Sequence, residues 1–560
     1  MARMMQAIGG LTVSARGTGP RLRPGLDWSG GMTWIVRGLL LLALVPLNAS
    51  ALAQVEEEPV TLLPHTSEGF GYESVVPEGW TDAGQGIFAR QRDAADTALI
   101  AQQSAPLPSS EVLPALLPQL QLTEPPESTG TYQGGALEWT LYEVDVSMDG
   151  IDVAVDLALA EEAGTTYIVL LQSPPDEYES LHERVFLPTL QVFAPLVELE
   201  ATVPYVVEDV RFESDGVTLV GTLTLPPNEG PHPAVVLVSG SGPQDRDEAL
   251  GGGIAIRPFR LLADALTRAG VAVLRYDDRG VGESTGTFSA ATLDDFANDA
   301  EAAIAYLTAR EEVDPGRIGL LGHSEGGLVA AMLGARHADL DFIISLAGPG
   351  VKGSDVLLLQ NERLMEAEGA PREAIVAQVA FVEELIGLLD DPEAVEALVY
   401  EHTLDQVSML PEEERARLGD LEQYARGVAQ QSAQQYSAGW FASFLNYDPA
   451  PDWARTTVPV LAIFGGKDVQ VDAQQNAPAL AAALAQAGND DFAIVVLPEA
   501  NHLFQAAETG AFSEYATLPA EFTPDLAPTI VGWLALHVAP GSAPAATPAA
   551  APAATPVAVP

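Results

Sequence analysis

The feature that most constrains this chain is a segment near its middle in which an apolar run leads into Gly-X-Ser-X-Gly. Residues 318–321 form the apolar run, residues 322–326 read Gly-His-Ser-Glu-Gly, and the small residues of 328–335 predict a helix. A strand that turns directly into a helix must bend sharply, and glycines at 322 and 326 avoid collisions with neighbouring backbone. The bend lifts the hydroxyl of Ser324 to the N-terminal end of a helix, where developing negative charge is favoured. Ser324 is therefore the candidate nucleophile.

A serine hydroxyl needs a base, and the best candidate is His502. It alone of the eight histidines stands in a loop directly after a late apolar run, and sites of α/β sheets form at the carboxyl ends of the strands. His323 neighbours the serine, but a sharp turn points adjacent side chains elsewhere. The remaining histidines are predicted to lie in the N-terminal region, ahead of the core, at helix ends or in a helical insertion: His65, His182, His232, His337, His402 and His537.

The histidine in turn needs a carboxylate that holds its tautomer and stabilises its cation. Asp468 follows the strand pattern of residues 460–464 through Gly-Gly-Lys, and it stands between the serine and the histidine in chain order. Asp472 is a nearby rival, but it falls at the expected start of the next helix, where an acid complements the helix dipole. The predicted triad is Ser324, His502 and Asp468.

Acyl transfer also needs backbone N–H groups directed at the oxyanion. One is predicted to be the N–H of Glu325, directly after the nucleophile. The second is predicted to be the N–H of Ser241, in the glycine-rich loop Ser239-Gly240-Ser241-Gly242-Pro243, with Gly240 allowing the turn. The alternative is that this loop is a simple glycine-rich turn.

The second half of the chain has the pattern of a doubly wound α/β sheet. Two strands are predicted at 210–212 and 219–225, around Ser-Asp-Gly. Short, continuous apolar runs then predict strands buried on both faces, at residues 234–238, 271–276, 318–321, 342–346, 460–464 and 492–497. Helical segments alternate with them, and the clearest begins at Thr292, which can form a capping box with Asp295. Alternation of strands and helices is typical of an α/β sheet.

No strand pattern occurs between the runs that end at Leu346 and begin at Val460. The intervening segment is acidic, rich in Gln, Glu and Ala, and periodic like a helix, and it is too long for a loop. We predict a helical cap over about residues 352–445, inserted into a catalytic domain of residues 205–539.

Residues 55–200 predict a separate small α+β domain without catalytic motifs. A strand is expected at 72–77, a hairpin of 137–146 and 151–159 around Asp149-Gly150, a third strand at 165–171, and a closing helix at 180–193. The Val-Pro-Glu-Gly-Trp sequence of residues 76–80 and the closing helix resemble Mog1/PsbP-like domains of exported bacterial proteins. An unrelated α+β domain is the alternative.

The sequence predicts that both ends of the chain lie outside the folded domains. Arg37, the apolar run of residues 38–47 and the small residues at 50–53 predict a signal peptide cut after Ala53, with Met32 as a possible true start. An uncleaved anchor is the alternative; no other stretch predicts a membrane span. The Ala-, Pro- and Thr-rich residues 540–560 predict a disordered tail. These segments predict a secreted or periplasmic location.

Charge and composition exclude several function classes. The formal net charge of −52 disfavours nucleic acid and anionic membrane as partners. The absence of cysteine excludes disulfides, thiolate metal sites and a cysteine nucleophile. No phosphate-binding loop or zinc motif occurs, so no metal and no cofactor are expected.

Five phrases occur in the order found in EstD-like carboxylesterases of the S33-type branch of the α/β-hydrolases. They are the stretches 239–247 and 275–284, Gly322 to Gly327, Gly466-Lys467-Asp468, and Asn501-His502. The resemblance covers roughly residues 205–538 and implies ester hydrolysis, the triad above and a helical cap. Ser239 departs from the histidine of many relatives. Asp278-Arg279-Gly280 is interpreted as a strand-end turn held by an Asp–Arg pair, and Asp245-Arg246-Asp247 as a charge pair that orders its loop.

The sequence therefore predicts a secreted serine carboxylesterase that acts on short- or medium-chain acyl esters, with a small-molecule ester as its substrate. A serine aminopeptidase or other amidase with the same triad is the main alternative. A binding protein on an inactive hydrolase scaffold is the third hypothesis, and the intact set of candidate residues argues against it.

Overall fold

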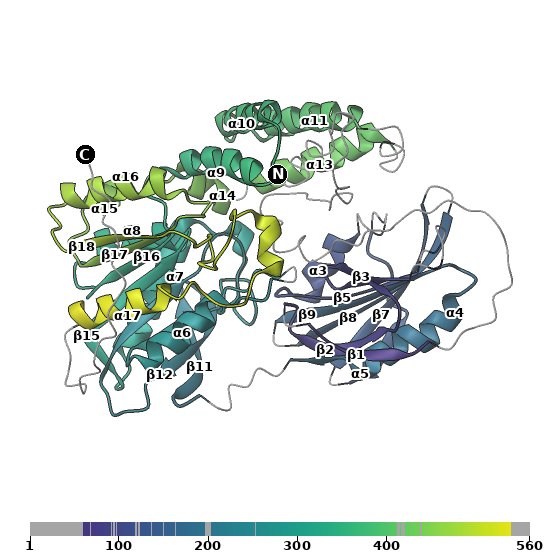
Figure 1. Cartoon of the computed structure of the whole chain (residues 1–560), viewed down its shortest axis with the longest axis horizontal. Helices are drawn as coiled ribbons and strands as arrows, with labels where there is room; N and C mark the ends of the chain where they lie inside the picture. The colour runs from purple at the N-terminus through teal and green to yellow at the C-terminus, as the bar shows by residue number, and fades with distance from the viewer. Residues whose placement is uncertain are drawn as a thin grey trace. The chain divides into compact units, whose positions relative to one another are not determined.

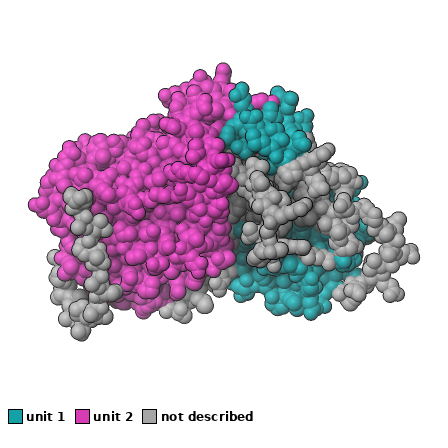
Figure 2. All heavy atoms as spheres, turned by 45° about the horizontal axis from the view of Figure 1, so that its top comes forward, with its two compact units in different colours: residues 1–199, 250–255, 401–426 teal, residues 200–249, 256–400, 427–560 magenta. Residues whose placement is uncertain are grey.

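The computed structural model of the chain contains two compact units (Figure 2). One holds the described residues of 1–199, 250–255 and 401–426, and the other those of 200–249, 256–400 and 427–560. The structure describes residues 60–538 apart from 68, 91, 93–95, 97, 118–119, 121, 123, 136, 149–150, 163, 197–202, 252–253, 411–414, 416–419 and 437–438. The predicted signal peptide of residues 1–53 and the tail of 540–560 lie outside this range. Within it, no helix is long and apolar enough to cross a membrane.

The first unit contains a seven-stranded antiparallel sheet of order β3-β4-β5-β9-β8-β7-β6. Its strands are β3 (Thr81–Gly84), β4 (Ile87–Ala89), β5 (Leu99–Ala105), β6 (Gly130–Gly134), β7 (Leu137–Met148), β8 (Ile151–Glu162) and β9 (Thr165–Ser173). Strands β7 and β8 are the arms of the hairpin that the sequence predicts, although the turn at 149–150 lies outside the described residues. The sequence did not indicate β3, β4, β5 and β6.

A smaller sheet and short helices also belong to this unit (Figure 1). The order β1-β2-β10 joins β1 (Leu62–Ser67), β2 (Tyr72–Pro77) and β10 (Ala194–Pro195), and α3 (Ser109–Leu116) follows β5. The expected single helix of 180–193 consists instead of α4 (Tyr178–Leu181), the π-helical turn His182–Phe186 and α5 (Leu187–Val192). Phe193 anchors its end, because its buried ring stacks on Tyr72 and meets Trp139 edge-on. The likeness to Mog1/PsbP-like domains stays a prediction.

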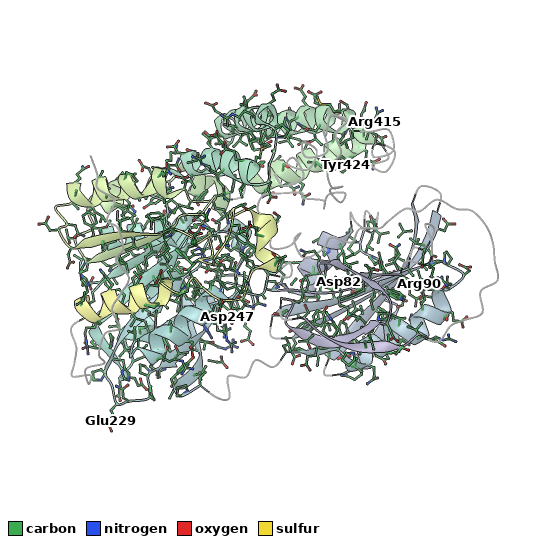
Figure 3. The ribbon with its side chains drawn as sticks, viewed as in Figure 1. Asp82, Arg90, Glu229, Asp247, Arg415 and Tyr424 are labelled. Atoms are coloured by element: carbon green, nitrogen blue, oxygen red, sulfur yellow. The ribbon has the colours of Figure 1, made fainter. Side chains whose placement is uncertain are left out.

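Charged side chains also hold the first unit together. Arg90, labelled in Figure 3, donates to both oxygens of the buried Asp96 at 2.8–3.0 Å and reaches Glu177 at 2.9 Å. The two carboxylates outweigh the effect of burial and raise the pKa of Arg90, so this guanidinium stays charged.

The second unit is built on an eight-stranded sheet of order β11-β12-β14-β13-β15-β16-β17-β18. Its strands are β11 (Val206–Ser214), β12 (Val217–Leu225), β13 (His232–Val238), β14 (Ala272–Tyr276), β15 (Val313–His323), β16 (Ile343–Leu346), β17 (Val460–Gly465) and β18 (Phe492–Leu497). Strand β12 is antiparallel to both neighbours, whereas the pairs from β14 to β18 are parallel. Every residue of β14, β16 and β17 is buried, as continuous apolar runs predict.

Helices cover this sheet as the alternating pattern predicts. Helix α6 packs against α17, and a second group joins α7 to α8, α8 to α15 and α15 to α16. Their bounds are α6 (Pro258–Arg268), α7 (Leu293–Thr308), α8 (Gly326–Arg336), α15 (Ala450–Trp453), α16 (Ala473–Gln486) and α17 (Leu526–His537). Helix α7 begins with the predicted capping box, in which Thr292 and Asp295 satisfy each other's backbone N–H groups. The structure thus has the predicted α/β fold.

The segment predicted as a cap is mainly helical in its described residues. It contains α9 (Gly353–Ala367), α10 (Arg372–Gly387), α11 (Pro392–Ser408), α13 (Leu421–Tyr436) and α14 (Gly439–Asn446). Helix α9 packs on α10 and on α14 (Figure 1). The N–H of Gly353 donates to the carbonyl of Tyr447 at 3.1 Å, so the insertion leaves and re-enters the core at neighbouring points.

Candidate active site

Ser324 occupies the sharp turn between β15 and α8. Its φ of 52° lies in the left-handed region, a strained conformation for a residue with a side chain. A Cβ on Gly322 would come within 2.0 Å of the carbonyl oxygen of Gly326, and one on Gly326 within 2.2 Å of that of Val238. Both glycines are therefore needed for close backbone approach. The Ser324 N–H donates to the carbonyl of Leu346 at 2.8 Å, which ties the turn to β16.

The three predicted triad side chains meet at the carboxyl edge of the sheet. His502 Nε2 lies 3.0 Å from Ser324 Oγ, and His502 Nδ1 lies 2.9 Å from Asp468 Oδ2. These distances suit a histidine that donates from Nδ1 to the carboxylate and accepts the serine proton at Nε2. His502 and Asp468 are buried, at 6% and 5% exposure, whereas Ser324 is partly exposed.

The backbone holds Asp468 in this orientation. Its Oδ1 accepts from the N–H groups of Gln470 and Val471 at 2.8 and 2.9 Å, which leaves Oδ2 for the histidine. The rival Asp472 has another task, since it caps α16 by accepting from the N–H groups of Gln474 and Gln475. The two acids are thus distinguished by their contacts.

The glycine-rich loop after β13 passes beside the nucleophile. A Cβ on Gly240 would lie 3.1 Å from that of Ser324. The Gly240 N–H is occupied, because it donates to Gln244 Oε1 at 3.1 Å and to Glu248 Oε1 at 3.0 Å. For the backbone N–H groups of Ser241 and Glu325, no acceptor occurs among the described residues. They are the two donors predicted to face the oxyanion.

A second acid–histidine pair lies behind the triad and was missed in the sequence. His323 Nδ1 lies 2.6 Å from Glu248 Oε1, and its Nε2 donates to the carbonyl of His502 at 2.9 Å. Burial disfavours a charged imidazole, but the carboxylate of Glu248 outweighs it and raises the pKa of His323. The pair links the loop of the histidine to the Gly240 loop. Glu248 is fully buried and has a positive φ, and a sequence displays neither property.

The side chain of Glu325 is also part of the site, although the sequence pointed only to its N–H. It is 3% exposed and accepts hydrogen bonds from Trp440 Nε1 and from Ser241 Oγ. Burial raises the pKa of Glu325 to about 7, against the effect of these two donors. Trp440 belongs to the cap helix α14, and no motif in the sequence identified it.

Asp278 and Arg279, which lie beside the site, do not form the ion pair that the sequence predicted. Arg279 pairs with Asp299 at 2.7 Å and Asp295 at 3.2 Å in α7, not with Asp278. Asp278 instead accepts from Ser239 Oγ at 2.7 Å and from the N–H of Gln244 at 3.0 Å. The expected Asp–Arg pair was wrong because each side chain has its partners elsewhere, Arg279 in α7 and Asp278 in the loop after β13.

The charges of the loop after β13 find their partners on β14 and the residue that follows it. Arg246 forms an ion pair with Asp277 at 2.7 Å, and Asp247, labelled in Figure 3, pairs with Arg275 at 3.0 Å. They order the loop as predicted, but through residues outside their own cluster.

Among the described residues, no group of histidines and acids is arranged to hold a metal ion. A sheet with an antiparallel second strand, a serine at a strained strand–helix turn and an acid and a histidine after later strands define an α/β-hydrolase fold.

Comparison with known proteins agrees with this fold. Residues 251–407 match the family described as serine aminopeptidase, S33. Esterase EstD of Thermotoga maritima is 28% identical over 319 residues, which cover 56% of this chain and 66% of that protein. The putative hydrolase YtaP of Bacillus subtilis is 30% identical over 168 residues, which cover 25% of this chain and 56% of that protein. The chain thus spans just under two thirds of the first relative and just over half of the second.

A solved structure of an esterase from Pyrococcus furiosus is 15% identical, with a TM-score of 0.37, and the match covers 60% of this chain and 93% of that one. The chain is thus similar to the serine aminopeptidase, S33 family over residues 251–407 and to a protein described as an esterase over 319 residues.

Proposed function

We propose that the protein is a secreted serine carboxylesterase that hydrolyses short- or medium-chain acyl esters. The observation that carries the proposal is the hydrogen-bonded series Ser324–His502–Asp468 at the strained turn, with the N–H groups of Ser241 and Glu325 beside it. The similarity to a protein described as an esterase supports the choice of ester as substrate.

The mechanism follows from this geometry. His502 Nε2 removes the proton of Ser324 Oγ while the oxygen attacks the acyl carbon, and Asp468 stabilises the imidazolium. The N–H groups of Ser241 and Glu325 stabilise the oxyanion. Collapse of the tetrahedral intermediate breaks the ester C–O bond, and the alcohol leaves with the proton from His502. Water then attacks the acyl-enzyme by the same route and releases the acid.

Secretion is proposed from the N-terminal sequence alone. Arg37, the apolar residues 38–47 and the small residues before Gln54 have the order of a signal peptide. Expression in a bacterial host, followed by N-terminal sequencing of exported protein, tests this part, and we expect a mature chain that begins at Gln54. Full-length chain retained in the membrane fraction would favour an anchor instead.

The match to serine aminopeptidases makes an amidase the second candidate. The test is hydrolysis of p-nitrophenyl esters of increasing acyl length beside aminoacyl-p-nitroanilides. We expect ester turnover that Ser324→Ala abolishes and that the exposed Ser513→Ala preserves. Dominant anilide turnover would replace the esterase by the amidase, and the absence of any turnover would refute both.

A further inference from the structure

The Glu325 carboxyl group has no part in the acyl-transfer steps above, yet it lies between the two proposed oxyanion donors. Its Oε2 accepts the Oγ–H of Ser241 at 3.1 Å, and both of its oxygens accept from Trp440 Nε1, at 2.8 and 3.0 Å. The backbone N–H groups of Ser241 and Glu325 are the proposed oxyanion hole. One side chain therefore joins both halves of that hole.

Trp440 in turn connects this carboxyl group to the base of the cap. Its ring, 1% exposed, packs against Phe288, Phe441 and Phe444, with ring centroids 5.6–6.4 Å apart. One turn further along α14, Ser443 Oγ accepts the N–H of Leu293 at 3.1 Å, the first residue of α7. Helix α14 is therefore fixed to the core at Trp440 and at Ser443.

We propose that the ionised carboxylate of Glu325 is a positioning residue that holds the Ser241 loop and the cap helix α14 in the arrangement that forms the oxyanion hole. This inference rests on the proposed function, since it names a residue that acts through the oxyanion donors of that site. It is distinct from the contribution of the Glu325 backbone, which any residue at the position would supply.

The contacts require the ionised form. Trp440 Nε1 is a donor only, and it bridges both carboxyl oxygens while Ser241 Oγ uses one of them. A proton on either oxygen would disturb the bifurcated contact with Trp440 or turn the Ser241 hydroxyl around. Because burial raises the pKa of Glu325 to about 7, this change falls within the pH range of an esterase assay.

Three other ionisable groups lie close to Glu325. Asp278, Asp299 and Tyr276 line the same cavity, of about 10 Å³, which is at the lower limit for one water molecule. Burial raises the pKa values of Asp278 and Tyr276 well above their usual ranges, and burial likewise raises that of Asp299 although Arg279 binds it. From α14, the facing group is the uncharged Trp440.

A fall in pH should weaken the support of the oxyanion hole. Glu325 is ionised above its pKa, so the oxyanion hole loses its support as the pH falls through about 7. A general base must also be free of its proton to act, so its protonation lowers activity in the same direction. The acid limb of kcat/KM for the wild type should therefore reflect two protonations.

The experiment measures kcat/KM against pH with p-nitrophenyl butyrate for the wild type, Glu325→Gln and Trp440→Phe. Glu325→Gln should lower kcat by about 10- to 100-fold at pH 8 and reduce the acid limb to one protonation. Trp440→Phe removes a donor that stabilises the carboxylate, so it should move the acid limb to higher pH. The exposed cap variant Glu373→Gln is the matched control and should leave the profile unchanged.

A two-proton limb retained in Glu325→Gln, or an unmoved limb in Trp440→Phe, would overturn the proposal while leaving the esterase intact. If the wild type hydrolysed no ester, the proposed function would fail and this role with it.

A denaturant titration gives a readout that does not depend on turnover. The folded protein holds the Glu325 proton to higher pH than the unfolded chain, so the wild type should lose stability relative to Glu325→Gln as the pH rises from about 4.5 to 7. A constant difference would show that folding does not raise the pKa of Glu325, and it would overturn the predicted loss of support as the pH falls.

Discussion

Replacement of Gly326 by alanine tests whether close backbone packing sets the geometry of the site. Gly326 is the first residue of α8, and a Cβ there would lie 2.2 Å from the carbonyl oxygen of Val238 and 2.8 Å from that of Ser239. Both obstructing atoms belong to the backbone that enters the Ser241 loop. The added methyl group must therefore displace either the serine turn or this loop.

The size of the displacement can be taken from the structure. Ordinary contact begins at 3.4 Å, so a Cβ at 2.2 Å demands a shift of about 1.2 Å. A misplacement of about 1 Å in a catalytic arrangement costs on the order of 100-fold in rate, equivalent to about 2.7 kcal/mol. Overpacking of a rigid core adds a loss of about 1–3 kcal/mol in the free energy of unfolding.

The assay compares kcat, KM and urea unfolding midpoints of the wild type, Gly326→Ala and Gly532→Ala. Gly532 lies in α17, where an added Cβ would meet no atom of the described residues within 4 Å, so the same substitution there should leave kcat unchanged. It should stabilise the helix by about 0.5–1 kcal/mol. A Gly326→Ala enzyme that folds, as judged by circular dichroism, and keeps the wild-type kcat would refute the reasoning.

Three further predictions follow from other contacts. Asp468→Asn should lower kcat by about 10⁴-fold with little change in KM, because the histidine loses the carboxylate that holds its tautomer. The control Asp472→Asn should leave kcat near the wild-type value. Equal losses of kcat in the two variants, measured by stopped-flow assay, would contradict the assignment. The raised pKa of His323 stabilises the fold below pH 6.5, and this stabilisation is lost as the pH rises through the folded-state pKa. The stability lost in His323→Gln should therefore be largest at acid pH and smaller at alkaline pH. Urea midpoints of the wild type and the variant that differ equally at every pH would disprove this. Thr292→Ala removes the N-cap of α7, so it should lower the free energy of unfolding by about 1 kcal/mol, measured by denaturant titration, and leave kcat unchanged. A loss of activity instead would show that α7 does more than support the sheet.

The sheet and the candidate triad could be predicted because their signals are local. Gly-X-Ser-X-Gly has a steric meaning within five residues, and apolar runs mark strands wherever both faces are buried. The runs at 460–464 and 492–497 differ from β17 and β18 by at most one residue. Since parallel strands end at the same edge, the residues that follow them converge there, and His502 and Asp468 could be chosen by position alone.

The N-terminal unit was predicted less completely. Its long hairpin of β7 and β8 shows clear alternation, but the edge strands β3 and β6 are short and exposed, and lack a buried face that would impose a pattern. The π-helical turn at His182–Phe186 likewise has no signal in the helical spacing of 180–193.

The sequence by itself determined the turn at Ser324, the alternation of strands and helices, and the order of serine, acid and base, because each depends on residues that are neighbours in the chain. Only the tertiary structure decided that Glu325 meets Trp440, 115 residues away, that His323 meets Glu248, 75 residues away, and that Arg279 turns to α7. The physical reason is that a buried charge or donor must find a partner wherever the fold brings one, and composition and periodicity carry no record of which partner that is.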